Sequence, residues 1–492
     1  MQNLLDQVDV GAEAAPSKPW SPNQQAVFEA VRDPDQHICI QAVAGSGKST
    51  TIIEATKHAP GSSLFMAFNK AIAEDIRNKG PQGDVRTLNA LGHSLVVANR
   101  PDAQLNARKM QDLVKKVMGE GEDSREWSYA VARACGVAKN SCVGIGSQPQ
   151  ASEFTQILDA YTDVPFDKLE DFGFVAREAF ELSRLDTKTF DFDDQLWVPV
   201  SEGWTFPAYN TVFVDEAQDM SPIQHEMCSR LAGRGARIVA VGDRHQAIYG
   251  FRGALHDSMD QLKAKFGMLE LPLSVSYRCS EAVVHAAQEF CPTIQWRDGA
   301  PKGLVEWKQR DYANCSDYAR YMVLCRNNAP LFKWILRHVR EHAPCQVLSS
   351  FLDSFGGFLR GFKATWTSDL SAKLDNWYER ERAAAQAKNA KGKLIALQDK
   401  FDTAQLLCRQ FKQTSEILDL LKTLGYSKRG PIFATIHKSK GLEHSHVYLL
   451  RPDLLGGFGE MTAEQQQQEA NLHYVAITRS ADTLVYGEGV QR

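Results

Sequence analysis

The stretch that decides the fold is His37–Thr50, HICIQAVAGSGKST, in which an apolar run leads directly into a glycine-rich turn. The run His37–Val43 has the length and the apolar character of a buried strand. Gly45 and Gly47 let the backbone turn tightly so that its N–H groups converge, and the helix expected next adds its positive N-terminus. The segment follows the pattern GxxxxGK[ST], with Ala42 in place of the first glycine. We therefore predict a site for nucleotide phosphates at the end of a parallel strand.

The residues of this turn are the first candidate nucleotide contacts. Lys48 is expected to reach the β and γ phosphates, and the Ser49 hydroxyl is expected to hold Mg²⁺. The predicted phosphate-binding residues are Ala44, Gly45, Ser46, Gly47, Lys48, Ser49 and Thr50.

A second apolar strand ends in paired acids at Val212–Asp219, VFVDEAQD. Such a strand places carboxylates at the carboxyl edge of a parallel sheet, where α/β proteins bind their ligands. Asp215 is expected to coordinate Mg²⁺, and Glu216 to accept a proton from the attacking water. The two segments together predict ATP and Mg²⁺ as cofactors.

Short apolar strands recur in two sets, which predicts an α/β protein with two parallel sheets and helical insertions. The expected strands are 37–43, 63–68, 211–214 and 237–241 in the first set, and 304–307, 321–325, 345–348, 432–435, 446–450 and 483–486 in the second. The expected parts are a flexible tail (1–18), a first α/β domain (19–92 and 191–272), a helical insertion (93–190), a second α/β domain (273–354 and 429–492) and a short helical insertion (355–428). Within the last insertion, Tyr378–Lys400 is predicted to form one charged helix with a solvated face.

Composition narrows the class of protein. The chain has 492 residues, of which 43% are hydrophobic, and no run of 18 apolar residues that could span a membrane. Lys and Arg number 56 against 60 Asp and Glu, so bulk positive charge cannot coat nucleic acid, although a local basic groove is allowed. The ten cysteines contain no CxxC pair, which argues against a zinc site or a disulfide framework.

Taken in order with five further segments, AGSGKST and DEAQD resemble the UvrD/Rep branch of superfamily 1 helicases. The further segments are Trp20–Gln24 (WSPNQ, the Q motif), Gly242–Ala254 (GDRHQAIYGFRGA, motif III), Ser276–Arg278 (SYR, motif IV), Thr435–Glu443 (TIHKSKGLE, motif V) and Tyr474–Arg479 (YVAITR, motif VI). Finer features are similar to the F-box DNA helicase branch and to phage-encoded UvrD-like proteins, without an F-box: Phe68–Glu74 (FNKAIAE), Arg86–Leu88 (RTL) and Phe190–Trp197 (FDFDDQLW). The resemblance implies two RecA-like domains, 1A and 2A, with insertions 1B and 2B.

The resemblance also implies roles for single residues at the nucleotide. Gln24 would read adenine, Tyr277 would stack on it, and Gln246 would sense the γ phosphate or orient water. Arg278 and Arg479 would reach across the cleft from domain 2A as arginine fingers. The implied catalytic residues are Lys48, Asp215, Glu216, Gln246, Arg278 and Arg479, and Gly441 and Glu443 of motif V are implied nucleotide contacts.

On the DNA side, the resemblance implies contacts on the lip opposite ATP, where aromatic and guanidinium planes stack on bases without reading sequence. The implied residues are Phe68, Asn69, Thr87, Phe251, Arg252 and His437. The chain departs from the family at or near some of these residues: Ala67-Phe68-Asn69 leaves the motif Ia aromatic shifted or lost, Asn89 replaces a usual His, and His444 replaces a common Phe.

The function that these features predict is an ATP-driven single-stranded DNA translocase and helicase, moving 3′→5′ by family analogy. Its partners would be single strands, single-strand/duplex junctions and replication or repair proteins, with no membrane. We expect a cytoplasmic protein in a bacterium or phage-infected cell and a nuclear one in a eukaryote. A non-motor P-loop enzyme, a passive single-strand binder, an RNA motor and a protein-stripping translocase stay open. Arg278 and Arg479 favour a motor, because a single P-loop domain needs no arginines from a second set of strands.

Overall fold

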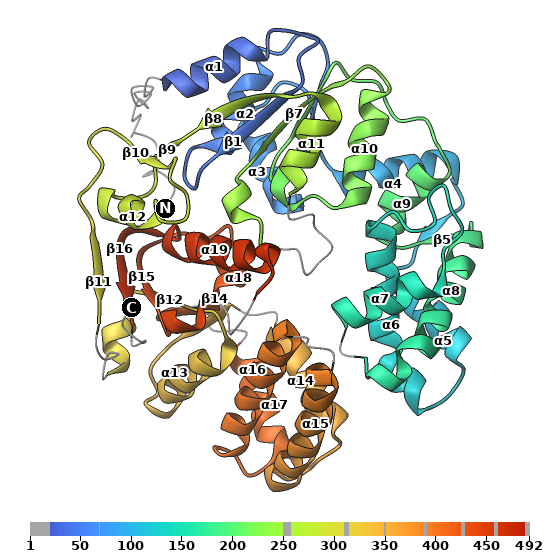
Figure 1. Ribbon diagram of the computed structural model, residues 1–492, viewed down its shortest axis with the longest axis vertical. Coiled ribbons are helices and arrows are strands. Elements are labelled where there is room, and N and C mark those ends of the chain that lie inside the picture. Colours follow the sequence, from blue (N-terminus) through green and yellow to red (C-terminus); the bar gives the residue numbers. More distant parts are fainter. Residues whose placement is uncertain are drawn as a thin grey trace, which may run out of the picture.

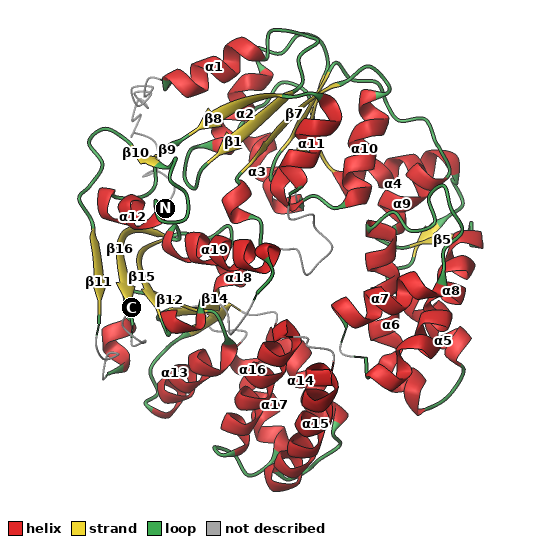
Figure 2. Ribbon diagram, viewed as in Figure 1, coloured by secondary structure: helices red, strands yellow, loops and turns green. Residues whose placement is uncertain are grey.

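The computed structural model describes residues 20–67, 69–162, 164–248, 257–308, 314–348, 351–387, 391–424, 429–456 and 461–487. Two α/β lobes and two helical lobes follow one another around a ring-like outline (Figure 1). The expected tail at 1–18 lies outside the described residues. Figure 2 shows strands mainly in the α/β lobes, which confirms the predicted fold class of two parallel-sheet domains with helical insertions.

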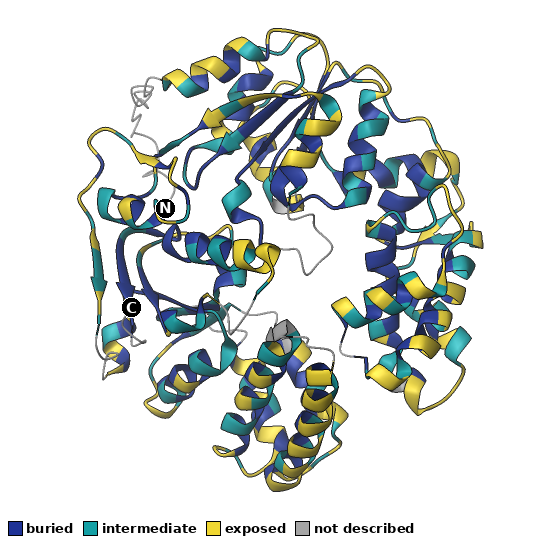
Figure 3. Cartoon of the chain, in the orientation of Figure 1, coloured by how far each residue is buried: buried dark blue, intermediate teal, exposed yellow. Residues whose placement is uncertain are grey.

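Domain 1A is built on six parallel strands in the order β3-β2-β6-β7-β1-β8. The strands are β1 (Ile38–Ala42), β2 (Ser63–Ala67), β3 (Asp84–Thr87), β6 (Thr211–Val214), β7 (Arg237–Gly242) and β8 (Leu269–Leu273). Its helices are α1 (Pro22–Ala30), α2 (Lys48–Thr56), α3 (Lys70–Asn78), α9 (Asp194–Ser201), α10 (Pro222–Ala232) and α11 (Ser258–Phe266), with 3₁₀ turns η2 (Ala217–Asp219) and η3 (Arg244–Gln246). The central strands are apolar on both faces because helices cover both, so they are buried throughout (Figure 3).

Insertion 1B is a helical lobe that enters and leaves at the β3 side of this sheet. Its elements are α4 (Leu88–Asn99), β4 (Gln104–Leu105), α5 (Lys109–Met118), α6 (Glu122–Asn140), α7 (Ala151–Tyr161), α8 (Leu169–Leu185) and β5 (Thr189–Phe190). The short strands β4 and β5 pair in parallel where the chain leaves and returns. One continuous core joins 1B to domain 1A, with Phe154 and Phe180 in the same cluster as Leu64 and Val212. The insertion is therefore anchored to the first sheet by shared apolar packing.

Domain 2A repeats the parallel architecture in the order β11-β16-β15-β12-β14-β13. Its strands are β11 (Leu304–Trp307), β12 (Met322–Cys325), β13 (Gln346–Leu348), β14 (Ile432–Thr435), β15 (His444–Leu449) and β16 (Ser480–Tyr486). Its helices are α12 (Glu281–Ala287), α13 (Asn328–Arg340), α18 (Ile436–Ser439) and α19 (Ala463–Ile477), and a small pair joins β9 (Val275–Ser276) to β10 (Gln295–Trp296).

Insertion 2B separates the neighbouring strands β13 and β14 in sequence. It comprises α14 (Phe351–Gly361), α15 (Thr367–Ala387), α16 (Lys391–Cys408) and α17 (Thr414–Leu424). The prediction of one charged helix over Tyr378–Lys400 is wrong, because α15 ends and α16 begins inside this stretch. Tyr378, Ala385 and Leu397 are buried between the two helices, so the sequence pattern hid a helical hairpin behind its charges.

Insertion 2B also shares its core with domain 2A. Leu374 and Leu421 lie in the same apolar cluster as Trp334 and Ile335 of α13. The carboxylate of Asp399 on α16 accepts the backbone N–H groups of Asn328 and Ala329, at 2.9 and 2.8 Å, and so caps the start of α13. Among the described residues, no helix combines the length and apolarity that a membrane crossing needs.

Candidate nucleotide site and nucleic-acid interface

The glycine-rich turn after β1 has the geometry of a phosphate cradle. Gly45 and Gly47 adopt left-handed backbone conformations, with φ of +71° and +76°. A Cβ at Gly45 would lie 2.5 Å from Cβ of Arg278, so glycine is required there by close packing as well as by conformation. Helix α2 then begins at Lys48 without a side-chain cap. Its first N–H groups are therefore available to phosphate oxygens.

An unsatisfied polar atom inside the turn points to the same use. The Ser46 hydroxyl is buried and has no hydrogen-bond partner among the described residues. Helices α1, α3 and α4, in contrast, are each capped by the side chain of their N-cap residue. A group that brings acceptor oxygens would satisfy both Ser46 and the start of α2, so a nucleotide triphosphate fits this turn.

The acids of β6 meet the turn as the sequence predicts. The Lys48 ammonium lies 3.1 and 3.2 Å from the two carboxylate oxygens of Glu216, and the Ser49 hydroxyl donates to Asp215 Oδ2 at 3.1 Å. Ser49 and Asp215 thus present two oxygens side by side, which suits Mg²⁺, an ion that takes few protein ligands and keeps several waters. The residues present fit the predicted metal.

The two neighbouring carboxyls differ in pKa. Burial and the adjacent Glu216 charge raise the pKa of Asp215 to about 6. Burial would also raise the pKa of Glu216, but the Lys48 and Lys440 ammonium groups outweigh it and lower that pKa to about 2. Glu216 is therefore ionised at neutral pH while it is paired with Lys48.

The predicted adenine residues border the phosphate turn. Gln24 is buried on α1, where its carbonyl accepts Ser21 N–H at 3.0 Å and its amide donates to the Thr51 hydroxyl at 2.9 Å. Tyr277 donates its backbone N–H to the carbonyl of Gly45 at 2.8 Å, and its side chain is partly exposed. Thr50 lies on the exposed side of α2, away from these contacts.

A bond between motifs III and VI joins the two domains. Arg479 is buried at the end of α19, where its guanidinium donates to Gln246 Oε1 at 3.1 Å and to the carbonyls of Leu442 and Val475 at 2.9 and 3.1 Å. Burial and the nearby Arg278 lower the pKa of Arg479 to about 10, so it is still a cation at neutral pH. Gln246 in turn donates to Asp243 at 2.6 Å.

Motifs IV and V contribute further residues to the same junction. Arg278 lies 2.5 Å from Glu443 through its Nε and donates to the carbonyl of Thr478 at 3.3 Å. Gly441 stands two residues before Glu443 with φ of +85°, in open space, so the loop turns there without steric crowding. The structure thus gathers every described nucleotide residue that the sequence predicts, except Thr50, around one junction of the two sheets.

Several contributors to this junction were not predicted, although each stands inside a quoted segment or beside one. Lys440 of motif V reaches Asp219 at 2.5 Å and the carbonyl of Gln246 at 2.6 Å. The Tyr474 hydroxyl accepts the N–H of Ala44 at 2.9 Å. Further members are Gln218, which donates to Glu216 and accepts Asp243 N–H, and Asn471, which donates to the carbonyls of Arg244 and Ala247.

Two of the predicted DNA residues follow strands that lie away from the nucleotide turn in the first sheet. Asn69 and Thr87 follow β2 and β3, at the side of sheet 1A remote from β1, and cap α3 and α4. His437 follows β14 of domain 2A in a half-buried position. Phe68, Phe251 and Arg252 lie outside the described residues. Asn69, Thr87 and His437 each follow the carboxyl end of a parallel strand, the edge at which α/β proteins bind their ligands.

An exposed aromatic beside Thr87 was missed. Phe192 follows β5, where the chain returns from 1B, and about half of its surface (52%) is exposed. Its carbonyl accepts the Asn89 side-chain amide at 2.8 Å, which ties it to the start of α4. Phe192 belongs to the segment FDFDDQLW, which resembles the family, but its alternating aromatic and acidic residues do not reveal which aromatic is buried.

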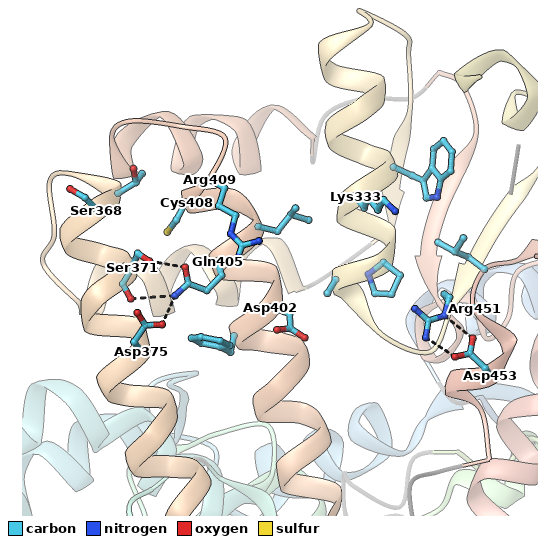
Figure 4. A pocket seen from close by; sticks show the side chains of 17 residues that line it. Lys333, Ser368, Ser371, Asp375, Asp402, Gln405, Cys408, Arg409, Arg451 and Asp453 are labelled. Carbon is cyan, nitrogen blue, oxygen red and sulfur yellow. Dashed lines mark hydrogen bonds and ion pairs between the residues drawn. The ribbon is translucent and has the colours of Figure 1, made fainter. Parts of the chain in front are cut away.

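A large groove lies away from this junction. A groove of about 1160 Å³ separates α13 from α15 and α16, at the junction of 2A and 2B (Figure 4). Its charged lining residues are three cations, Lys333, Arg409 and Arg451, and three anions, Asp375, Asp402 and Asp453. The lining has no excess of positive charge and holds none of the predicted nucleotide residues, so the junction of the two sheets is the better candidate for nucleotide phosphates.

Comparison with known proteins gives two family matches. The UvrD/REP helicase N-terminal domain matches residues 93–267, and the UvrD-like helicase C-terminal domain matches residues 367–487, together more than half of the chain. F-box DNA helicase protein 1 of Schizosaccharomyces pombe is 25% identical, over all of this chain and 60% of that protein. F-box DNA helicase 1 of Gallus gallus is 27% identical over 95% of this chain and 49% of its own length, and ATP-dependent DNA helicase PcrA of Bacillus subtilis is 26% identical over 58% and 40%. The chain therefore spans no more than 60% of these relatives.

Proposed function

Because the chain belongs to the UvrD-like helicases of superfamily 1, we propose that it is an ATP-driven translocase and helicase acting on single-stranded DNA. The observation that carries the proposal is the contact of Arg479 with Gln246, which brings a buried cation of domain 2A to the phosphate side of domain 1A. A nucleotide switch confined to one domain has no need of this contact. A motor needs it, because ATP must alter how two domains hold a strand.

In the proposed reaction, Lys48 exchanges Glu216 for the β and γ phosphates of ATP. Glu216, released from that ion pair, takes a proton from the attacking water. Arg278 and Arg479 neutralise charge that develops on the transferred phosphoryl group, an effect worth about 10³–10⁵ in rate for such arginines. Ser49 and Asp215 would hold Mg²⁺, which supplies charge neutralisation at the phosphates.

Loss of the γ phosphate removes the group that both domains bind, so hydrolysis weakens closure. Asn69, Thr87 and Phe192 on domain 1A and His437 on domain 2A are the described residues we propose for the strand. Stacking on an exposed aromatic such as Phe192 is independent of sequence, as a motor on mixed DNA requires. Alternating grip by the two domains then converts ATP turnover into steps.

The direction of movement is proposed as 3′→5′. The test is strand displacement on duplexes with a 3′ or a 5′ single-stranded tail, with ATP and with Lys48→Ala as the inactive control. Unwinding of the 3′-tailed substrate alone is expected. Unwinding from the 5′ tail alone would refute the direction.

A second candidate is a translocase that strips proteins from DNA with little unwinding. The observation that favours it is the small insertion 2B, whose described helices lie within 351–424 and are packed into the core of domain 2A. Removal of streptavidin from a 3′- or 5′-biotinylated single strand measures translocation without a duplex. Streptavidin displacement without strand displacement would select this candidate over the helicase.

A further inference from the structure

A buried cluster of opposite charges lies between insertion 1B and the segment that returns to domain 1A. The Lys139 ammonium lies 2.7 Å from Asp194 and 3.1 Å from Asp191, and the Lys109 ammonium lies 2.8 Å from Asp194. All four side chains are less than a tenth exposed. Lys109 and Lys139 come from α5 and α6, so both helices are tied to the returning segment.

The geometry of this cluster specifies position more than it adds stability. Removing four charges from water costs several kcal/mol per ion, and pairing restores this only when further hydrogen bonds are made. Here they are made: Asp194 N–H donates to Asp191 Oδ1 at 2.7 Å, and Asp191 N–H donates to Asp194 Oδ2 at 3.1 Å. Apolar residues could fill the same space, but they would not fix the backbone of residues 191–194 in this way.

The fixed segment carries the exposed Phe192 and is held from its other side by α4. Gly92 approaches it so closely that a Cβ there would lie 1.8 Å from the carbonyl oxygen of Gln195. The Asn89 amide donates to the carbonyl of Phe192 at 2.8 Å and to Gln195 Oε1 at 3.1 Å. The backbone of Phe192 is therefore clamped between α4 and the buried charges.

One residue continues the clamp toward the nucleotide site. Asn140, the last residue of α6, donates to Asp193 Oδ1 at 2.8 Å and accepts the Ser221 hydroxyl at 3.4 Å. Ser221 is the N-cap of α10 and stands two residues after Asp219 of the DEAQD segment. Asn140 thus bridges the Phe192 segment and the residues that follow the catalytic acids.

We propose that Asn140 is a positioning residue that couples single-strand binding at Phe192 to ATP turnover. This proposal rests on the proposed function. The buried charges hold the segment in the DNA-competent position, and the bond between Asn140 and Ser221 transmits that position to the start of α10.

The bridge has two bonds, so two variants separate its two effects. Ser221→Ala removes the link to α10 and leaves Asn140 on Asp193. We expect turnover at saturating single-stranded DNA to fall about threefold, with no change in the DNA concentration for half-maximal stimulation. Asn140→Ala removes both bonds. It should show the same fall in turnover and, in addition, about a tenfold rise in that DNA concentration, since it loses a hydrogen bond to a carboxylate.

Matched controls exist in the chain. Asn99 is also the last residue of its helix and, like Asn140, donates to the carbonyl four residues back at 2.9 Å, so its substitution removes the same bond within a helix. Asn99→Ala should leave turnover at saturating DNA and the half-maximal DNA concentration unchanged. Ser221→Thr, which retains the hydroxyl, should give the wild-type values of both. ATP turnover without DNA should be the same in all four variants.

A purely structural role would give a different result. If Asn140→Ala lowers the melting temperature but moves neither turnover nor the half-maximal DNA concentration by more than twofold, the proposal is overturned. It is also overturned if Ser221→Ala raises the half-maximal DNA concentration as much as Asn140→Ala does. A wild-type chain without any DNA response would refute the proposed function instead. Hydrogen exchange of residues 191–195 would then decide whether Asn140 holds the segment: unchanged exchange in Asn140→Ala would refute that role as well.

Discussion

Lys440→Met should open the cleft between the domains, because Lys440 forms the buried ion pair with Asp219 across it. The side chains are 8% and 2% exposed, and the Nζ–Oδ2 distance is 2.5 Å. Burial raises the pKa of Asp219 to about 6 in spite of Lys440, which lowers it. Without the ammonium group, the Asp219 carboxylate in the closed state would lose its hydrogen-bonded cation and keep the charge of Glu216 as a neighbour.

The size of the effect follows from these pKa values. With a pKa of about 6 in the closed state against 3.8 in water, burial of the ionised Asp219 costs about 3 kcal/mol beside Lys440. In Lys440→Met, burial of the ionised carboxyl costs more than protonation, so Asp219 takes up a proton in the closed state. Protonating a carboxyl with a pKa of 3.8 costs about 5 kcal/mol at pH 7.5. The difference, about 2 kcal/mol, lowers the closed-to-open ratio about 30-fold.

The effect has a definite pH dependence. The pKa of the buried Asp219 lies above its value in water, so acidification neutralises the carboxyl in the closed wild-type protein as the pH falls through about 6. Near and below that pH both proteins close with a protonated Asp219, and the penalty of the substitution shrinks to a few-fold. The disadvantage of Lys440→Met therefore grows as the pH rises from 6 to 7.5.

The assay is kcat/KM for ATP at saturating single-stranded DNA, measured at pH 6.0 and 7.5. We expect a loss of about 30-fold at pH 7.5 and of less than about fivefold at pH 6.0. The double variant Asp219→Asn/Lys440→Met should recover much of the loss at pH 7.5, since neither partner is then left charged. A Lys440→Met protein within twofold of wild type at pH 7.5, or equally impaired at both pH values, would refute the reasoning.

Three further predictions follow from the site and the core. Lys48→Ala should abolish ATP hydrolysis while circular dichroism and single-strand binding persist, and hydrolysis at the wild-type rate would remove the phosphate assignment. Arg479→Lys should lower kcat by about 10³ or more, because an ammonium cannot make the three directed bonds of the guanidinium; a loss below tenfold would contradict this. Replacing residues 365–425 with a Gly/Ser linker should yield aggregated or unfolded protein, because it removes Leu374 and Leu421 from the core around Trp334. A monodisperse deletion variant with a cooperative thermal unfolding transition would contradict the shared core.

The sequence predicted the parts of the fold that depend on local chemistry. A continuous apolar strand followed by glycine, Lys48 and a helix has few alternatives, and β1, β6 and β7 lie close to where they were expected. Strand β8 was missed because its pattern is LELPL, largely exposed, with a proline that an edge strand tolerates. The α15–α16 hairpin was missed because its buried residues are spaced among charges.

The candidate site also has residues that could be predicted from the sequence and residues that could not. Lys48, Asp215 and Glu216 are specified by residue type and position next to a strand, so their proximity could be predicted. The bond from Asn140 to Ser221 joins residues 81 positions apart, and neither belongs to a pattern that sequence reasoning recognises. The cluster around Lys139 was hidden for a related reason, since a lysine on a helix is usually solvated and only the tertiary structure buries this one.

The most direct test of the central claim is steady-state ATP turnover by the full chain, with and without single-stranded DNA, beside Arg479→Ala and Lys48→Ala. If two domains act on a strand as proposed, saturating DNA should raise wild-type turnover at least tenfold, and added salt should raise the DNA concentration needed. Arg479→Ala should lose the stimulated rate. Turnover that is the same with and without DNA would contradict the account.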